Sequence, residues 1–507
     1  MANNFFLKKS VARIQEESMN STLKRSLGAW NLISLGIGCI IGTGIFVMTG
    51  QAAALHAGPA IMLSFVFAGL ACAFAGLCYA ELASTLPISG SAYTYTYATM
   101  GEIFAWVMGL LLILEYGVAA ATVAVGWSGY LVSFLKDFGI VIPPQFTSAY
   151  GQAVTLADGS TVSAIINLPA LIGIIAVTLL LVKGISESAT VNNIIVFVKV
   201  AVVITFILVG ISHIDVANWA PFIPPVEHFT DPKTGLEAER FGWSGVFRGA
   251  SIVFFAYIGF EAVSTAAQEA KDPQRTMPIG ILGSLFVCTV LYMLTSAVMT
   301  GVVHYSMLNV PDPMAVAADH IGIHWFSWLV KIGALMGMSS VMLVLMYGQT
   351  RIFYIMSRDG LLPAFFSDVH KKFHTPWKNT LLVGSIVAIL AATTPLKTLG
   401  DMVSFGTITA FAMVSFSVIY LRRTQPELER PFRTPFYPIV PILGMVSCVG
   451  LLSTFELHYY IFIAEWIACG LVIYFVYGRH HSRIANEQRP LEADAEFIKK
   501  AHEPQID

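Results

Sequence analysis

Charged residues are scarce in this sequence. Aspartate, glutamate, lysine and arginine make up 12% of the 507 residues, whereas hydrophobic residues make up 56% and the mean hydropathy is +0.71. A soluble domain of ordinary composition carries about 25% charged residues. The composition therefore excludes a soluble globular protein and indicates an integral membrane protein. The net charge of −2 gives no sign of a nucleic-acid partner.

Motifs of disulfide frameworks, metal sites and enzymes are also missing. The six cysteines lie within apolar runs and form no CxxC pair, so we expect buried small side chains rather than disulfides or a zinc site. The histidines form no HExxH motif, and no GxSxG motif occurs where a strand would meet a helix. A membrane enzyme would need a buried nucleophile or a metal cluster. These absences favour a protein that is not an enzyme and needs no cofactor.

Long apolar runs, by contrast, are abundant. A helix needs about 20 mostly apolar residues to cross a bilayer, because each backbone amide must be satisfied within the segment. Twelve runs qualify, and they cover residues 29–50, 60–84, 102–134, 165–182, 191–211, 243–266, 279–303, 325–356, 379–394, 400–421, 437–454 and 459–477. We therefore expect an all-α integral membrane protein with 12 transmembrane helices.

Lysine and arginine are concentrated on one side of this expected topology. They gather in the N-terminal segment 1–28, in the loops between helices at 267–278, 357–378 and 421–436, and in the tail 478–507, whereas the opposite loops hold few. Loops rich in lysine and arginine face the cytoplasm, so both termini are expected on the cytoplasmic side of the cell membrane and the loop 212–242 on its outer side. The first 26 residues lack an apolar core, so no cleaved signal peptide is expected.

The run GIGCIIGTGIF (residues 36–46) contains four glycines within the first expected helix. Gly38 and Gly42 have the GxxxG spacing of close helix packing, which is one interpretation. The segment from Gly42 to Gly44 instead places a hydroxyl and two flexible positions in the middle of the span, which favours a broken helix. Unpaired backbone at that depth persists only around a cavity. No lysine or strand pattern follows, so a phosphate-binding loop is poorly supported.

A second interrupted run lies five helices later. The sequence FFAYIGFE (residues 254–261) combines Gly259 with the mid-membrane acid Glu261. Paired broken helices at matching positions of two inverted repeats are typical of secondary transporters, whose binding sites lie between them. We therefore expect residues 29–211 and 243–421 to form two inverted repeats, with the helices of residues 422–477 appended.

Six motifs in order strengthen this interpretation: GIGCIIGTGIF, ILEYGVA, VKVAVV, FFAYIGFEAVSTAAQE, KDPQRTMPIGI and MYGQTRIFYIMSRDGLLP. Together they resemble the amino acid-polyamine-organocation superfamily, in its cationic amino acid transporter branch as found in bacteria. The resemblance extends from about Leu27 to Gly478. It implies the leucine-transporter fold, with inverted repeats of five helices, two added helices, and helices one and six broken. It also implies a secondary active amino acid permease, with the proton as coupling ion.

The resemblance also marks a binding site for an L-amino acid. The substrate carboxylate is expected to meet backbone amides at a helix N-terminus, and its ammonium is expected to meet carbonyls exposed by the two breaks. The expected amide donors are Thr43, Gly44 and Ile45, next to Gly42, and the expected carbonyl acceptors are Ile40, Phe255, Ala256 and Ile258. An exchanger and a non-transporting amino acid sensor remain open, as does the oligomeric state, and a monomer is compatible with the sequence.

The resemblance implies that three side chains set the substrate selectivity and the proton coupling of this site. Glu115 is expected to receive polar or cationic side chains, although a structural acid is the alternative. Leu345 is implied to line the side-chain compartment, although core packing is the default for a leucine, and we expect a preference for small to medium neutral amino acids. Lys199 is buried too deeply to reach the interface, so it is our candidate proton site, with a permanently charged lysine as the alternative. The role of Glu261 stays open, because it can lie in the cytoplasmic half of helix six and pair with a neighbour, whereas Glu81 is expected to be structural.

Overall fold

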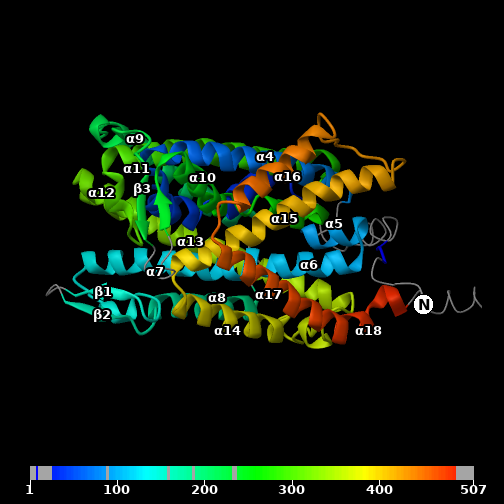
Figure 1. Ribbon diagram of the computed structural model, residues 1–507. Helices are drawn as coiled ribbons and strands as arrows, with labels where there is room; N and C mark the ends of the chain where they lie inside the picture. Colours follow the sequence, from blue (N-terminus) through cyan, green and yellow to red (C-terminus); the bar gives the residue numbers. More distant parts are fainter. Residues whose placement is uncertain are drawn as a thin grey trace, which may run out of the picture.

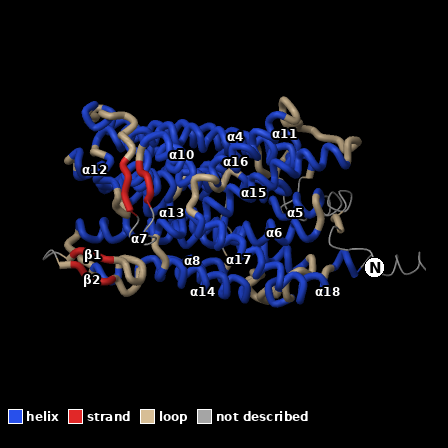
Figure 2. The backbone as a smooth tube through the Cα atoms, in the orientation of Figure 1, coloured by secondary structure: helices blue, strands red, loops and turns tan. Residues whose placement is uncertain are grey.

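The computed structural model describes residues 7–9, 26–86, 91–156, 160–184, 189–230 and 237–486. Within these ranges the chain is almost entirely helical, as Figure 2 shows. The strands found there form two short antiparallel hairpins in loops, β1 (Ala153–Thr155) with β2 (Thr161–Ser163) and β3 (Glu227–Thr230) with β4 (Glu237–Arg240). The expectation of an all-helical architecture is confirmed.

Helices fill the first half of the chain, and short π or 3-10 segments, labelled η, interrupt them. In order they are α2 (Ala29–Ile40), η2 (Gly44–Met48), α3 (Thr49–Ala52), η3 (Ala53–Ala57), η4 (Gly58–Ala60), α4 (Ile61–Thr85), α5 (Ser91–Thr99), α6 (Glu102–Leu112), η5 (Ile113–Val118), α7 (Ala119–Asp137), η6 (Pro144–Phe146), α8 (Leu168–Lys183) and α9 (Ala189–Ile211). Segments that are apolar on every face are typical of helices surrounded by protein and lipid.

The second half repeats this pattern of long helices with short interruptions. Its helices are η7 (Val216–Trp219), α10 (Gly242–Val253), η8 (Phe254–Tyr257), η9 (Glu261–Glu269), α11 (Pro273–Val302), η10 (Tyr305–Leu308), α12 (Pro313–Ile321), α13 (His324–Arg358), η11 (Ala364–Ser367), α14 (Trp377–Thr393), α15 (Leu396–Thr424), α16 (Ile439–Leu452), α17 (Leu457–Ile473), η12 (Tyr474–Gly478) and α18 (Arg479–His481). Every one of the twelve apolar runs found in the sequence is helical over most of its length.

Eight helical stretches of the described chain are long and apolar enough to cross a membrane by length and composition. The number is lower than twelve because four apolar helices are shorter than 18 residues, namely α2, α8, α14 and α16. One of these, α2, is short because the first expected helix is broken after Ile40. The second half of that broken helix continues into α4, so the two are counted as one stretch, Gly44–Thr85.

The helices lie in two layers (Figure 1). Helices α4, α10 and α11 lie together on one side of the molecule, and α7, α8 and α14 lie together on the other. Helix α13 contacts both α2 of the first layer and α7 of the second. Helix α2, which ends at the first break, packs against α11 of the first layer and is also contacted by α13.

The outer surface of the helices is apolar. Phe197 and Leu208 of α9, Phe286 of α11 and Val446 of α16 are all well exposed, with 74% of Phe197 accessible. Large apolar surfaces of this kind are rare on soluble monomers and are expected where helices face lipid. Five of the six cysteines are buried as expected, whereas Cys469 of α17 is exposed.

Candidate functional site

The first expected helix is interrupted in the middle of its apolar run. Helix α2 ends at Ile40, Ile41 has an extended backbone with ψ of 98°, and η2 begins at Gly44. The Phe46 amide donates to the Gly42 carbonyl over 3.3 Å, at the start of the second half of the helix. The first amides of a helix lack partners within it and carry the positive end of its dipole. The break thus occurs at the glycines that predicted it.

The sixth expected helix is interrupted as well. Segment η8 is followed by Ile258, whose backbone is extended with ψ of 132°, and η9 begins at Glu261. Gly259 has φ of +119°, a conformation that strongly favours glycine. A Cβ atom at Gly259 would lie 2.8 Å from the carbonyl carbon of Cys39, so the second break packs against the last turn of α2.

The two breaks meet face to face. A Cβ atom at Gly44 would lie 2.3 Å from the Cα atom of Ala256, so only glycine fits at this contact. Thr43, directly before it, is buried, and its hydroxyl has no hydrogen-bond partner among the described residues. Ile45 and Phe255 are also buried. The structure therefore brings the residues predicted from the two glycine-containing runs into one place.

Two of the expected carbonyl acceptors already accept one hydrogen bond. The Tyr292 hydroxyl on α11 donates to the Ile40 carbonyl over 2.8 Å, and the Ile258 amide donates to the Phe255 carbonyl over 3.2 Å. A carbonyl oxygen has two lone pairs, so each can accept a second bond. Their assignment as ammonium acceptors stays a prediction.

The Lys199 side chain connects three helices next to the first break. Its side chain on α9 is fully buried, and its ammonium donates to the Gly38 carbonyl of α2 over 2.8 Å. The same ammonium donates to the Ser340 hydroxyl of α13 over 3.4 Å. An ammonium without water must be stabilised by such acceptors. A change in the protonation of Lys199 would act directly on the last turn of α2, just before the first break.

Two buried carboxyl groups, those of Glu115 and Glu261, lie near the second break. Glu115 lies in η5, a π-helical stretch of the kind often found at functional sites, and neither of its oxygens has a hydrogen-bond partner among the described residues. Glu261 accepts from the Gly259 amide over 2.9 Å and from the Tyr116 hydroxyl over 3.4 Å. The carboxyl groups of Glu115 and Glu261 lie close enough to interact with each other. Glu261 thus supports the second break directly.

Helix α13 presents an apolar face to the first break. A Cβ atom at Gly42 would lie 3.1 Å from a methyl group of Val341, and Leu345 follows one turn later on the same face. Both side chains are buried. Val341 therefore packs against the broken backbone, and Leu345 continues the same face of α13; its contact with a bound substrate side chain stays a prediction.

Sequence reasoning missed Val341 and Tyr292 and left the role of Glu261 open. A valine or tyrosine within an apolar helix has no local sign of such a contact, because the contact depends on how distant helices pack. For Glu261 a signal was present, since it lies two residues after Gly259 and can accept from the amide that the break exposes.

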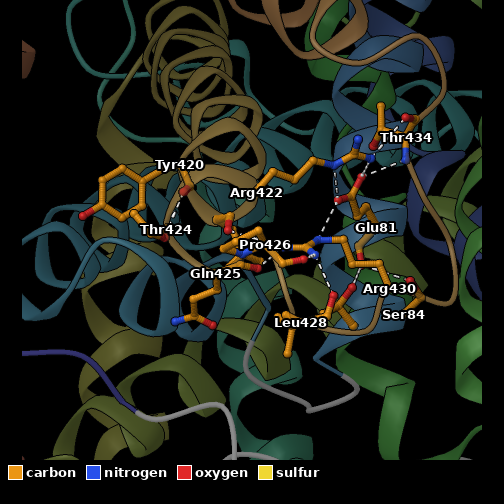
Figure 3. Close-up of polar contacts among 12 residues, drawn as sticks. Glu81, Ser84, Tyr420, Arg422, Thr424, Gln425, Pro426, Leu428, Arg430 and Thr434 are labelled. Atoms are coloured by element: carbon orange, nitrogen blue, oxygen red, sulfur yellow. Dashed lines mark hydrogen bonds and ion pairs between the residues drawn. The ribbon is translucent and has the colours of Figure 1, made fainter.

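Glu81 holds the loop between α15 and α16 in place (Figure 3). Its buried carboxylate on α4 accepts from Arg422 Nε over 2.8 Å and Nη2 over 2.6 Å, and from the Thr434 amide over 2.7 Å. Arg430 lies 3.6 Å from the same carboxylate and donates to carbonyls of the loop, including that of Leu428. Glu81 is therefore engaged in structural contacts, away from the two breaks.

Replacement of Glu81 by glutamine is expected to destabilise the protein. The change leaves Arg422 without its bidentate partner at a buried position, which costs about 3 kcal/mol. The thermal unfolding midpoint of the purified variant in detergent should fall by several degrees. Glu427→Gln, an exposed glutamate in the same loop, is the control and should match the wild type. Equal midpoints for both variants would contradict a structural role for Glu81.

No group of three or more histidine, cysteine, aspartate or glutamate side chains in the described ranges could hold a metal ion. The chemistry available at the breaks consists of backbone amides and carbonyls, one ammonium group and two carboxyl groups. Such groups can bind a zwitterion and can exchange protons.

Comparisons with known proteins agree with this geometry. The sequence profile of the amino acid permease family matches residues 27–477. The chain is 45% identical over 486 residues to the branched-chain amino acid permease BcaP of Bacillus subtilis, covering 96% of this chain and 100% of the relative. It is 44% identical over 480 residues to the methylthioribose transporter of the same organism, covering 95% and 99%.

A plant relative extends the comparison. The chain is 38% identical over 433 residues to the chloroplastic cationic amino acid transporter 9 of Arabidopsis thaliana, covering 85% of this chain and 72% of the relative. All of these relatives are transporters or permeases, and none is an enzyme. The chain therefore belongs to the amino acid permease family of the amino acid-polyamine-organocation superfamily, and its activity is amino acid transport across a membrane.

Proposed function

We propose that the chain is a secondary active transporter that takes up neutral L-amino acids across the cytoplasmic membrane by alternating access, with the proton as coupling ion and no other cofactor. The observation that carries the proposal is the contact between the two helix breaks at Gly44 and Ala256. A single chain contains both breaks, so a monomer would hold the complete site.

The proposed topology has twelve crossings in the leucine-transporter arrangement. Residues 29–211 and 243–421 form the two inverted repeats, and the helices of residues 422–477 are added to them. The matched interruptions of the first and sixth expected helices support this division. Both termini are proposed to be cytoplasmic. In support, the Glu102 amide donates to the Leu7 carbonyl and the Ser482 hydroxyl donates to the Glu102 carboxylate, so both terminal segments meet at one end of the bundle.

The backbone at the breaks is proposed to bind the part that all amino acids share. The amides of Thr43, Gly44 and Ile45 stand at a helix N-terminus, where the dipole favours a carboxylate. The carbonyls of Ile40, Ala256 and Ile258, together with that of Phe255, would accept from the ammonium. Gly42 and Gly44 let the substrate approach the main chain without a side chain in the way.

The apolar face of α13 is proposed to select the substrate side chain. Val341 and Leu345 are buried next to the first break and offer methyl groups to an aliphatic side chain. Hydrophobic contact favours neutral aliphatic amino acids in such a compartment. The branched-chain specificity in the name of the BcaP relative agrees with this choice. Leucine, isoleucine and valine are therefore the proposed substrates.

Uptake into proteoliposomes tests the function. Purified protein should accumulate labelled leucine against its gradient when the lumen is made alkaline, and a protonophore should abolish the accumulation. An exchanger would instead require leucine or another amino acid inside the vesicles, and a sensor would bind leucine without moving it. Either result in place of pH-driven uptake would contradict proton-coupled transport.

Uptake of methylthioribose is the second candidate function, favoured by the 44% identity to the transporter of that name. This neutral sugar has neither a carboxylate nor an ammonium group. It would therefore lack the charged groups that the helix ends are proposed to bind. The same proteoliposomes, offered labelled methylthioribose, should show much slower uptake than with leucine. Faster uptake of methylthioribose would make it the preferred substrate.

Replacement of Leu345 by serine is expected to widen the substrate range. The change removes the two methyl groups and the methine group of leucine from the side-chain compartment and should admit lysine and arginine, whose KM should fall by about tenfold. Leu343→Ser, on another face of α13, is the control and should leave the order of substrates unchanged. If Leu345→Ser also leaves that order unchanged, Leu345 serves only in packing.

A further inference from the structure

Gln349 continues the face of α13 that meets the first break. It follows Leu345 by four residues and Val341 by eight, so the three side chains lie on one face of the helix. Gln349 is 1% exposed, and a Cβ atom at Gly117 of η5 would lie 3.3 Å from its side-chain oxygen. The face is thus apolar beside the break and polar where it meets η5.

The side-chain amide of Gln349 has no partner among the described residues. Neither its oxygen nor its nitrogen makes a hydrogen bond there. The neighbouring polar groups of α13 are satisfied: the Thr350 hydroxyl donates to the Tyr347 carbonyl over 2.9 Å, and the Ser339 hydroxyl donates to the Leu335 carbonyl over 2.7 Å. A buried amide without a partner is costly, so its presence calls for a ligand that supplies the bonds.

The Gln349 side chain faces the segment η5. Its oxygen lies against Gly117, where a Cβ atom would be 3.3 Å away. Glu115, two residues earlier in η5, interacts instead with the Glu261 carboxyl group. The unpaired polar group on this face of α13 is therefore the Gln349 amide, one turn beyond Leu345.

Resting on the function proposed above, we infer that Gln349 is a specificity-determining residue that lets the transport site accept amino acids whose side chains end in a carboxamide, of which glutamine is the reference substrate. The unpaired Gln349 amide, on the same face of α13 as Leu345, carries this inference.

The chemistry of the Gln349 amide matches a carboxamide. A carboxamide both donates and accepts, so it can pair with the Gln349 amide through two hydrogen bonds. The methylene groups of glutamine would pass Val341 and Leu345 as an aliphatic side chain does. A site built for hydrogen bonds discriminates strongly against an analogue that cannot make them.

Competition and uptake in proteoliposomes test the inference. In the wild type, glutamine should inhibit leucine uptake and should itself be transported. Methionine, which is of similar length and lacks the amide, reports on apolar binding alone. Gln349→Leu and Gln349→Met keep most of the side-chain volume and remove the amide. In both, the KM for glutamine should rise about tenfold or more, whereas the KM for methionine should change less than about twofold.

Thr350→Val is the matched control, because it removes a buried polar group of the same helix that is already satisfied. Thr350→Val should change the KM for glutamine and the KM for methionine by the same factor. Equal changes for glutamine and methionine in the Gln349 variants would assign Gln349 a structural role and overturn the inference. So would a wild type that transports leucine and ignores glutamine. Absence of leucine transport would instead contradict the proposed function, so the two failures are distinguishable.

Discussion

Gly44→Val is expected to abolish leucine binding and uptake. The new side chain would begin 2.3 Å from the Cα atom of Ala256, and the opposing atom is backbone, which cannot rotate away. The two broken helices would have to separate, and the amides proposed to bind the carboxylate would move with them. Leucine binding to purified protein, measured by its effect on the thermal unfolding midpoint, should disappear while the protein still inserts and folds.

Gly450→Val is the control for this experiment. It lies on α16 with no atom within 4 Å of its Cβ position, so the same substitution should leave binding and uptake as in the wild type. Normal leucine affinity in Gly44→Val would show that the substrate does not bind at the contact between the breaks.

Lys199→Ala is expected to abolish uptake driven by a pH gradient while part of the leucine binding remains. The variant loses the ammonium that donates to the Gly38 carbonyl over 2.8 Å, and with it the proposed link between protonation and the first break. Proteoliposomes with an alkaline lumen measure the driven uptake, and counterflow measures the remaining exchange. Lys136→Ala, an exposed lysine at the end of α7, should behave as the wild type.

Lys199→Arg separates the two interpretations of this lysine. Arginine keeps its charge under all physiological conditions. A proton site requires that the arginine variant lose pH-driven uptake as the alanine variant does, whereas a permanently charged structural lysine requires that it retain much of it. Continued pH-driven accumulation by Lys199→Ala itself would show that the proton couples elsewhere, with Glu115 the next candidate.

The positions of the breaks were predictable from the sequence for a local reason. Gly42 and Gly259 interrupt apolar runs that would otherwise form continuous helices, and the structure departs from helical geometry at these two glycines, whereas Gly44 begins the second half of the first broken helix. The burial of Lys199 and Glu115 could be predicted in the same way, because each is a single charge deep within an apolar run. Local signals of this kind do not depend on how helices pack.

The partners of these residues were not predictable, because they come from distant parts of the chain. Tyr292 is 252 residues from Ile40, to whose carbonyl it donates, and the Lys199 ammonium reaches a carbonyl 161 residues away. Val341 and Gln349 look like ordinary residues of an apolar helix until α13 is seen against the breaks. Helix ends were also missed by several residues, as in α11, which begins at Pro273 and not at residue 279, because the polar first and last turns of a helix lie outside the apolar run.

Competition by leucine analogues is the most direct test of the proposed site. The account requires that both the carboxylate and the ammonium be recognised by the backbone of the two breaks. Isopentylamine, which lacks the carboxylate, and 4-methylpentanoate, which lacks the ammonium, should each inhibit leucine uptake at least about a hundredfold more weakly than unlabelled leucine. Inhibition by either analogue as strong as that by leucine would contradict recognition of the zwitterion at the broken helices.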